Sequence, residues 1–284
     1  FGVPDPADDA YATAVNRRLA HWFTQERDAD RPWFAFVNHI EAHAPYDPPS
    51  SRLRFATNAL RAKWRDADQH FLMQTQALTG RAMLTETDVS ELIDLYDDEI
   101  AFVDQKVGEL LDALEASGEL ENTCVVITSD HGEQFGEHGL FDHIYSVDEP
   151  LLRVPLIVRW PGQQAARRDD RPRQTHDVFA SFTALAGIDD ARPIGSDTRD
   201  LRDDVDRARE RLAALESPLI SNVATWAARI PLTDYRRFLQ DRHALRRGEW
   251  KLSAAAEDPS RLYDVVADPQ ELVDRAATTS DTLS

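Results

Sequence analysis

The feature that most constrains the fold is a long amphipathic helix followed at once by a buried strand. Apolar residues recur at steps of three and four over Leu92–Leu114, which predicts a helix with one buried face. Thr85 and Asp88 resemble a capping box before this helix, and Gly118 is a typical helix stop. Thr123–Thr128 is short, apolar and rich in β-branched residues, as in a strand buried on both faces.

Other apolar runs extend this alternation of helices and strands. Trp33–Val37 and Val154–Trp160 are short and continuously apolar, which predicts two further buried strands. Helices are predicted over Tyr11–Gln25 and over Val178–Ala186, the second capped by Asp177. The order strand, helix, strand predicts an α/β fold with a mostly parallel central sheet flanked by helices.

The last third of the chain has a different pattern. Residues 188–216 are acidic and rich in Arg, which predicts a loop and a surface helix. Four short candidate strands then follow, separated by turn residues: Leu219–Trp226, Tyr235–Leu239, Trp250–Leu252 and Leu262–Val266. We therefore expect residues 1–187 to belong to the α/β domain and residues 188–284 to form a subdomain with a small antiparallel sheet.

Two polar loops follow predicted strands. Asn38–Pro49 holds three prolines, two histidines and two carboxylates, and it comes directly after Trp33–Val37. Ser129–Leu152 holds three histidines and three glycines, and it comes directly after Thr123–Thr128. Because ligands of α/β sheets gather at the carboxyl ends of the strands, we expect both loops to be functional.

Asp130 and His131 are the strongest candidate ligands in these loops. They offer one hard carboxylate oxygen and one imidazole nitrogen side by side. That pair suits Zn, Mn or Fe, or Ca where oxygen ligands dominate elsewhere. From the residues alone, the alternative is a structural glycine-rich loop in which the histidine forms hydrogen bonds within the protein and binds no metal.

Composition excludes several classes of function. With 51 acidic against 32 basic residues the formal net charge is −19, which disfavours a nucleic-acid partner. No apolar run approaches the roughly 20 residues needed to cross a bilayer. One cysteine permits neither an internal disulfide nor a cysteine zinc cluster.

The choice of charged residues suggests an origin. Since 34 of the 51 acidic residues are Asp and only three of the 32 basic residues are Lys, we infer a halophilic origin. Arg-biased codons in an acidic protein are the alternative.

Several motifs together resemble the sulfatase branch of the alkaline phosphatase superfamily. The segments that carry the resemblance most strongly are Tyr96–Ile100, Ser129–Glu133, Gly136–Gly139 and Arg153–Gly162. The segment before Pro49 resembles the family's Pro-His-x-Pro-Tyr, with Ala42 in place of the first proline. Asp177–Ile188 and Leu262–Pro269 match later landmarks, so the resemblance covers about residues 30–270.

The resemblance implies a role for three of these residues. Asp130 and His131 would be ligands of one divalent metal ion, for which the family favours calcium, with Mn or Zn as alternatives. His43 would contact the ester oxygen and protonate the leaving group.

Three further residues receive roles from the same resemblance. His143 stands where many relatives carry a lysine that contacts the sulfate. Only a protonated His143 supplies charge, so we expect its effect to vary with pH. His138 and Glu133 would support the site.

The resemblance also implies residues that this sequence does not contain. Family sulfatases use a formylglycine nucleophile made from Cys or Ser in Cys/Ser-x-Pro-x-Arg, and an Asp-Asp pair of metal ligands. Cys124 lies inside a predicted strand and is not in such a motif. We therefore expect the chain to be the C-terminal part of a sulfatase, inactive by itself.

The resemblance implies metal-dependent hydrolysis of a sulfate monoester, carried by a small molecule or a glycan. A phosphomonoesterase, a phosphodiesterase or a phosphonate monoester hydrolase of the same superfamily is the first alternative. A non-catalytic remnant or binding subunit with an incomplete metal site is the second. The motifs leave the substrate alcohol, the oligomeric state and the cellular location open.

Overall fold

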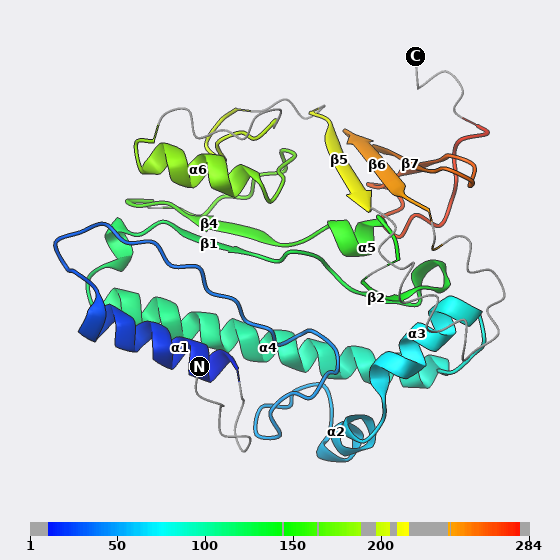
Figure 1. Ribbon diagram of the computed structural model, residues 1–284, viewed down its shortest axis with the longest axis horizontal. Helices are drawn as coiled ribbons and strands as arrows, with labels where there is room; N and C mark the ends of the chain where they lie inside the picture. The colour runs from blue at the N-terminus through cyan, green and yellow to red at the C-terminus, as the bar shows by residue number, and fades with distance from the viewer. Residues whose placement is uncertain are drawn as a thin grey trace. The chain divides into compact units, whose positions relative to one another are not determined.

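In the computed structural model, the chain forms two compact units (Figure 1). The first comprises Phe1–Ala77 and Arg81–Thr123, and the second comprises Leu78–Gly80 and Cys124–Ser284. The residues that the structure describes are 11–143, 145–163, 165–188, 197–204, 209–215, 238 and 240–278.

The described part of the first unit is helical. Its helices are α1 (Ala12–His21), α2 (Asn58–Arg65), α3 (Gln69–Thr79) and α4 (Glu86–Ala116). A π-helical turn, Trp22–Glu26, continues α1, and a 3₁₀ turn, Leu120–Asn122, follows α4. Figure 1 shows α1 lying beside α4. The helix predicted over Tyr11–Gln25 is thus confirmed, with its last turn widened to a π-helix.

The ends of α4 form as the sequence predicts. Thr85 accepts a hydrogen bond from the backbone N–H of Asp88 at 3.1 Å, and the Asp88 carboxylate accepts one from the Thr85 N–H at 3.0 Å. Gly118, with φ of 75°, follows the helix in the left-handed region. The apolar side chains of Leu92, Leu95 and Phe102 are buried, so the periodicity marks the packed face.

The predicted strand at Trp33–Val37 is wrong. The segment pairs with no other strand among the described residues. Trp33 packs against Phe23, with ring centroids 5.4 Å apart, whereas Phe34 and Phe36 are 67% and 83% exposed. This alternation is typical of extended chain. An apolar run favours extended backbone, but a strand also needs a neighbour to complete its hydrogen bonds.

The sheet at the start of the second unit is antiparallel. β1 (Val125–Thr128) pairs with β4 (Leu156–Arg159), and Val126 faces Val158 in the register. Every strand pair in the described residues is antiparallel, so the mostly parallel central sheet that the sequence predicts is not shown.

The connection between β1 and β4 accounts for the antiparallel pairing of these two strands. It contains the short hairpin of β2 (Gln134–Phe135) and β3 (Phe141–Asp142), followed by the single turn α5 (Glu149–Leu152). A parallel pair requires a crossover of a dozen or more residues, usually through a helix. Here a polar loop reverses the chain direction, so β4 returns antiparallel to β1.

The small C-terminal antiparallel sheet is confirmed. Its strands, in spatial order, are β5 (Arg211–Leu215), β6 (Arg242–Arg247), β7 (Trp250–Ala255) and β8 (Arg261–Asp264). The structure places β5 at the end of 188–216, where the sequence predicts a surface helix; alternating exposure along β5 marks it as a half-buried strand. The predicted strands Leu219–Trp226 and Tyr235–Leu239 lie outside the described residues, apart from Phe238.

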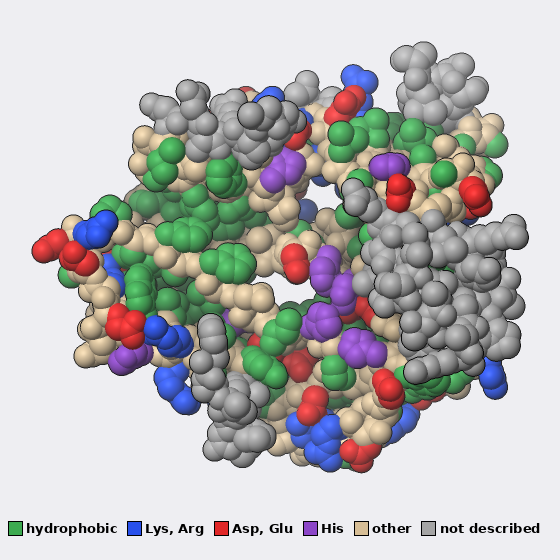
Figure 2. All heavy atoms as spheres, in the orientation of Figure 1, with side chains coloured by type: hydrophobic (Ala, Val, Ile, Leu, Met, Phe, Trp, Pro, Cys, Tyr) green, Lys and Arg blue, Asp and Glu red, His purple; other side chains and the backbone are tan. Residues whose placement is uncertain are grey.

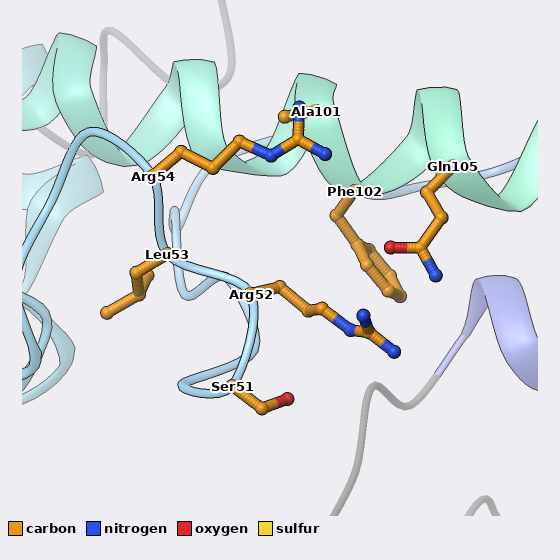
Figure 3. Close-up of a pocket in the computed structure, with 7 residues that line it drawn as sticks. All are labelled: Ser51, Arg52, Leu53, Arg54, Ala101, Phe102 and Gln105. Atoms are coloured by element: carbon orange, nitrogen blue, oxygen red, sulfur yellow. The ribbon is translucent and has the colours of Figure 1, made fainter.

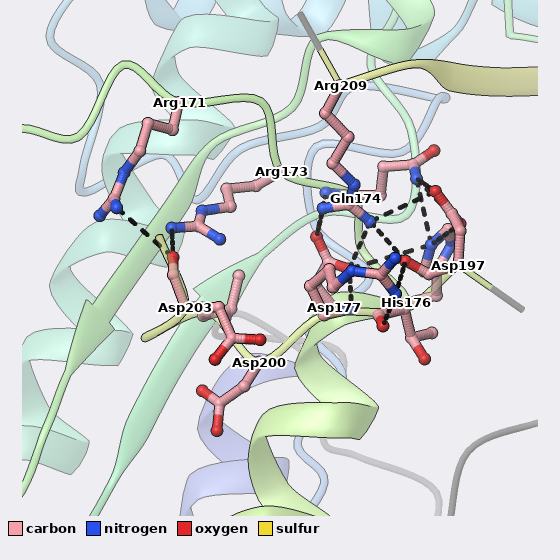
Figure 4. Close-up of polar contacts among 12 residues, drawn as sticks. Arg171, Arg173, Gln174, His176, Asp177, Asp197, Asp200, Asp203 and Arg209 are labelled. Atoms are coloured by element: carbon pink, nitrogen blue, oxygen red, sulfur yellow. Dashed lines mark hydrogen bonds and ion pairs between the residues drawn. The ribbon is translucent and has the colours of Figure 1, made fainter. Parts of the chain in front are cut away.

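Helix α6 (Asp177–Leu185) begins at a buried ion pair (Figure 4). Asp177 is fully buried and is the first residue of the helix; it does not cap the helix from outside as predicted. Its carboxylate accepts hydrogen bonds from Arg209 at 2.8 and 2.9 Å. It also accepts the backbone N–H groups of Gln174 and Arg199. Asp177 therefore joins three segments of the second unit.

Acidic and basic side chains are interspersed on the face that Figure 2 draws. Figure 2 shows acidic and basic side chains spread over the face in view, without one continuous patch of either sign among the described residues of that face. No helix within the described ranges is both long and apolar enough to cross a membrane.

Candidate functional site

The candidate site residues lie in two loops, one in each unit. We call residues 43–57 the His43 loop and residues 129–143 the Asp130 loop. Nδ1 of His43 lies 2.6 Å from the carbonyl oxygen of Ala44. Because a carbonyl oxygen only accepts hydrogen bonds, Nδ1 must carry the proton. Nε2 is then the nitrogen of His43 that can exchange a proton with a ligand.

Two consecutive carboxylates of α4 anchor the His43 loop. Asp98 accepts hydrogen bonds from the backbone N–H groups of Arg54, Phe55 and Ala56, at 2.6, 3.1 and 2.9 Å. Glu99 accepts the N–H of Asp47 at 3.0 Å. The Tyr96–Ile100 motif of the sequence therefore holds a loop in place.

The pKa of Glu99 is raised above its usual value. Burial raises the pKa of Glu99 to about 7, and the hydrogen bond from the Asp47 N–H only partly offsets this effect. The nearby carboxylates of Glu41 and Asp47 raise the pKa further, whereas Arg61 lowers it. Ionised Glu99 is therefore a destabilising group of the first unit.

The first two residues of α3 anchor the other end of the loop. Gln69, which is buried, accepts the N–H of Tyr46 at 2.8 Å and donates to the carbonyl of Tyr46 at 3.1 Å. His70 Nε2 lies 2.8 Å from the carbonyl oxygen of Ala44, the same atom that His43 contacts. Sequence reasoning missed both residues, since neither stands in a motif.

Ala42 precedes the His43 loop in an unusual conformation. Its φ is 71°, in the left-handed region. The proline that the family pattern carries at this position has φ fixed near −65° and could not adopt this backbone. A proline at position 42 is therefore incompatible with this local conformation.

A pocket opens between the His43 loop and α4 (Figure 3). Its volume is about 230 Å³, and it is lined on the loop side by Ser51, Arg52, Leu53 and Arg54 and on the helix side by Ala101, Phe102 and Gln105. Two guanidinium groups and a hydroxyl are donors that suit an anionic group. None of the predicted site residues lines this pocket.

The Asp130 loop presents the predicted metal ligands. His131 Nδ1 lies 2.8 Å from the carbonyl oxygen of Gly132, so this nitrogen carries the proton and Nε2 is the coordinating nitrogen. Nε2 lies 3.8 Å from Oδ2 of Asp130, whose side chain is 86% exposed. An imidazole nitrogen and a carboxylate oxygen are donors that would hold a divalent ion. These residues fit a metal ion.

Backbone contacts fix the start of the loop. The Gly132 N–H donates to the carbonyl of Leu151 at 2.8 Å, and the Ser129 hydroxyl donates to the carbonyl of His131 at 2.7 Å. A Cβ on Gly132 would lie only 2.0 Å from the Pro150 oxygen. The glycine of the Ser-Asp-His-Gly-Glu motif is therefore required by a close backbone approach.

The structure brings His143 together with His131 and Glu133. The rings of His131 and His143 are stacked, with centroids 4.1 Å apart. His143 Nδ1 lies 2.8 Å from a carboxylate oxygen of Asp142 and 3.5 Å from one of Glu133. Glu133, Asp142 and His143 also offer ligand atoms within 4.8 Å of one another. Sequence reasoning missed Asp142 as part of this cluster.

These carboxylates change the expected titration of His143. Burial lowers the pKa of His143, but the hydrogen bonds and charges of Asp142 and Glu133 outweigh burial and raise the pKa to about 10. His143 is therefore an imidazolium at neutral pH, and the pH dependence that we expect from a histidine moves to alkaline conditions.

His138 belongs to a different cluster. Its ligand atom lies within 4.8 Å of those of Asp148 and Glu271. The buried ammonium of Lys251 lies 2.8 Å from Glu271. His138 has φ of 55°, so a tight turn places its ring in this network. The structure thus groups His138 with a buried ionic network of the second unit.

The described residues form an α/β fold whose loops carry donor groups that suit a metal ion and an anionic group. The sulfatase family profile matches residues 5–188, and the chain belongs to the sulfatase family.

Two curated relatives support this membership. The chain is 30% identical to the choline-sulfatase of Rhizobium meliloti (strain 1021) over 292 residues, covering 95% of this chain and 51% of that protein. It is 33% identical to the ulvan-active sulfatase of Formosa agariphila over 173 residues, covering 59% of this chain and 31% of that protein. The chain thus spans about half the length of the choline-sulfatase.

The fold also resembles a solved hydrolase structure. The phosphonate monoester hydrolase of Silicibacter pomeroyi superposes with a TM-score of 0.67 at 19% identity, over 98% of this chain and 61% of that one. This likeness concerns the fold.

Proposed function

We propose that the protein containing this chain hydrolyses sulfate monoesters. The observation that carries the proposal is the stacking of His143, whose Nδ1 lies beside the carboxylates of Asp142 and Glu133, on His131, whose Nδ1 lies beside a carbonyl oxygen so that Nε2 can ligate a metal ion. A cation beside a metal ligand suits a tetrahedral group with negatively charged oxygens.

The mechanism assigns a task to each residue. Asp130 and His131 would hold one divalent ion, proposed to be calcium, which would polarise the sulfate oxygens. His143 donates a hydrogen bond to a sulfate oxygen and balances the charge that develops during bond cleavage. His43 donates the proton on Nε2 to the departing alcohol oxygen. Glu133 supports His143.

The nucleophile of this proposal is a formylglycine. The resemblance places it in a Cys/Ser-x-Pro-x-Arg motif, which the printed sequence does not contain. The expectation that the chain is inactive by itself follows from this difference and is part of the proposal.

The substrate class follows from the relatives. One is named a choline-sulfatase and the other an ulvan-active sulfatase, so we propose a sulfate ester of a small molecule or a glycan. A phosphonate monoester is the second candidate, because a hydrolase of that class shares the fold over 98% of the chain.

The decisive assay uses the natural protein in which this sequence occurs. Sulfate, phosphate and phosphonate monoesters of one phenol are compared, with His143→Gln as the test variant and exposed His21→Gln as the control. We expect the sulfate ester to react fastest and His143→Gln to lose about 100-fold or more in kcat/KM. A faster phosphonate ester would establish the alternative. No hydrolysis of any ester would favour a binding subunit.

The halophilic origin is a separate proposal. It rests on 34 Asp and three Lys in a chain with a net charge of −19. Salt screens the repulsion among these charges, so we expect Tm to rise as KCl increases from 0.1 M to molar concentrations. A Tm that is unchanged or lower in molar KCl would leave codon bias as the explanation.

A further inference from the structure

We propose that His70 is a positioning residue that holds His43 in the orientation and tautomer needed to protonate the leaving group. The inference rests on the proposed role of His43. His70 stands in no sequence motif, and it reaches His43 from the first turn of α3.

The two histidines meet at one carbonyl oxygen. His43 Nδ1 lies 2.6 Å, and His70 Nε2 2.8 Å, from the oxygen of Ala44. The rings are 6.0 Å apart and tilted by 55°, so the carbonyl and not ring stacking links them. A carbonyl oxygen has two lone pairs, and two N–H donors use both. The direction of the Ala44 carbonyl is thereby fixed from two sides.

The residue beside His70 fixes the next part of the backbone. Gln69 binds both the N–H and the carbonyl of Tyr46, at 2.8 and 3.1 Å. Consecutive side chains of α3 therefore hold Ala44 and Tyr46, the first and third residues after His43. Since the tautomer of a histidine is set by the hydrogen bond of its other nitrogen, a fixed Ala44 carbonyl fixes the proton on Nδ1.

The proton transfer from His43 shows why the tautomer of its neutral form matters. Protonated His43 carries hydrogens on both ring nitrogens. The Nε2–H bond breaks, its proton passes to the oxygen of the departing alcohol, and the N–H electron pair stays on Nε2. The neutral product is the Nδ1–H tautomer, which is the form that the Ala44 carbonyl stabilises. His70 favours this product state without touching the substrate.

Two amide substitutions separate the hydrogen bond from the rest of the side chain. The amide nitrogen of Gln occupies about the place of Nε2 in His, whereas that of Asn reaches only the place of Nδ1. His70→Gln should therefore keep the donor to Ala44, and His70→Asn should lose it. Both variants are polar, and His176→Asn, at an exposed histidine of the second unit, is the control.

The first readout is the tautomer of neutral His43, measured by nitrogen-15 NMR on this chain labelled at histidine. We expect the Nδ1–H form in the wild type, in His70→Gln and in His176→Asn. In His70→Asn the Nε2–H form should rise at least threefold. An unchanged tautomer in folded His70→Asn would overturn the proposal. If His70→Asn does not fold, a wild-type His43 that is not in the Nδ1–H form would overturn it equally.

The second readout uses the natural protein and two sulfate esters. An alkyl sulfate needs a proton on its leaving oxygen, whereas a nitrophenyl sulfate does not. His70→Asn should lower kcat about tenfold for the alkyl ester, with an unchanged KM, and leave the nitrophenyl ester nearly unaffected. Equal losses on both esters would show a merely structural role. Absence of hydrolysis by the wild type would refute the proposed function, while the NMR result would still decide the role of His70.

Discussion

The His43 loop and the Asp130 loop both carry candidate site residues, but they are held in different ways. Hydrogen bonds to side chains of α3 and α4, 23 to 52 residues away in sequence, anchor the His43 loop. The side-chain contacts that orient His131 and His143 come mainly from adjacent residues, such as Gly132 and Asp142.

This difference separates two kinds of polar side chain. In the His43 loop, buried Asp98 and Glu99 serve the backbone and are 1% and 6% exposed. In the Asp130 loop, the Asp130 carboxylate is 86% exposed. The same residue type therefore acts as an anchor in one unit and as a candidate ligand in the other. Substitutions should affect stability strongly in the first case and weakly in the second.

The largest effect should come from Asp98→Ala. The variant removes the acceptor of three backbone N–H groups, and we expect a loss of about 4 kcal/mol in the free energy of unfolding, since bonds to charged groups are stronger than neutral ones. Denaturant titration measures the loss. Asp112→Ala, at an exposed position on α4, is the control and should change stability by less than about 0.5 kcal/mol. Equal effects would contradict the anchoring role.

Glu99→Gln should stabilise the protein above neutral pH. The pKa of Glu99 is raised from 4.5 to about 7, so the folded state holds a proton that the unfolded state releases between these values. The stability of the wild type should therefore fall through this range, whereas that of the variant should not. At pH 8 the variant should be more stable by as much as about 3 kcal/mol, and at pH 4 the two should agree.

Thermal unfolding of both proteins from pH 4 to pH 8 tests this expectation. The uncharged Gln keeps an oxygen that can accept the Asp47 N–H, so the anchor survives while the charge is lost. A Tm difference that is constant across the pH range would contradict an elevated pKa for Glu99.

Much of the Asp130 loop could be predicted from the sequence. Asp130, His131 and Gly132 are consecutive, and their local contacts leave a recognisable signature. The same holds for the start of α4, where Thr85 and Asp88 bond to each other. Interactions between residues that are close in the sequence restrict which residue types stand next to one another, so sequence motifs reveal them.

The His43 loop and the sheets could be predicted only in part. Nothing next to His70 or Gln69 indicates that they meet a backbone more than 20 residues away. Trp33–Val37 has the composition of a strand, but strand formation depends on a neighbour that local composition does not specify. The antiparallel pairing of β1 with β4 depends likewise on how the whole connection folds.

Gly132→Ala tests the close approach within the Asp130 loop. The added Cβ would lie 2.0 Å from the Pro150 oxygen, so the backbone must shift. We expect a loss of about 2 kcal/mol, within the range for overpacked sites. Gly108→Ala is the matched control, because no atom other than its chain neighbours and the nearby backbone of α4 lies within 4 Å of its Cβ position. It should raise stability by up to about 1 kcal/mol through helix propensity. A loss in both variants would argue against a specific contact at Gly132.

Asp130→Ala should have the smallest effect on the metal-free protein, less than about 0.5 kcal/mol, because the side chain is exposed and anchors little. Its effect should emerge when a metal ion is added. Saturating Ca²⁺, Mn²⁺ or Zn²⁺ stabilises a folded state that binds it, by about 2.7 kcal/mol at 100 times Kd.

We therefore expect one of these ions to raise the Tm of the wild type, with EDTA reversing the rise. Asp130→Ala and His131→Gln should each abolish most of the increase. Asp112→Ala, which alters an exposed carboxylate of the other unit, should retain it. If Asp130→Ala instead destabilised the metal-free protein as strongly as Asp98→Ala, then Asp130 would be an anchor, and the contrast between the two loops would disappear.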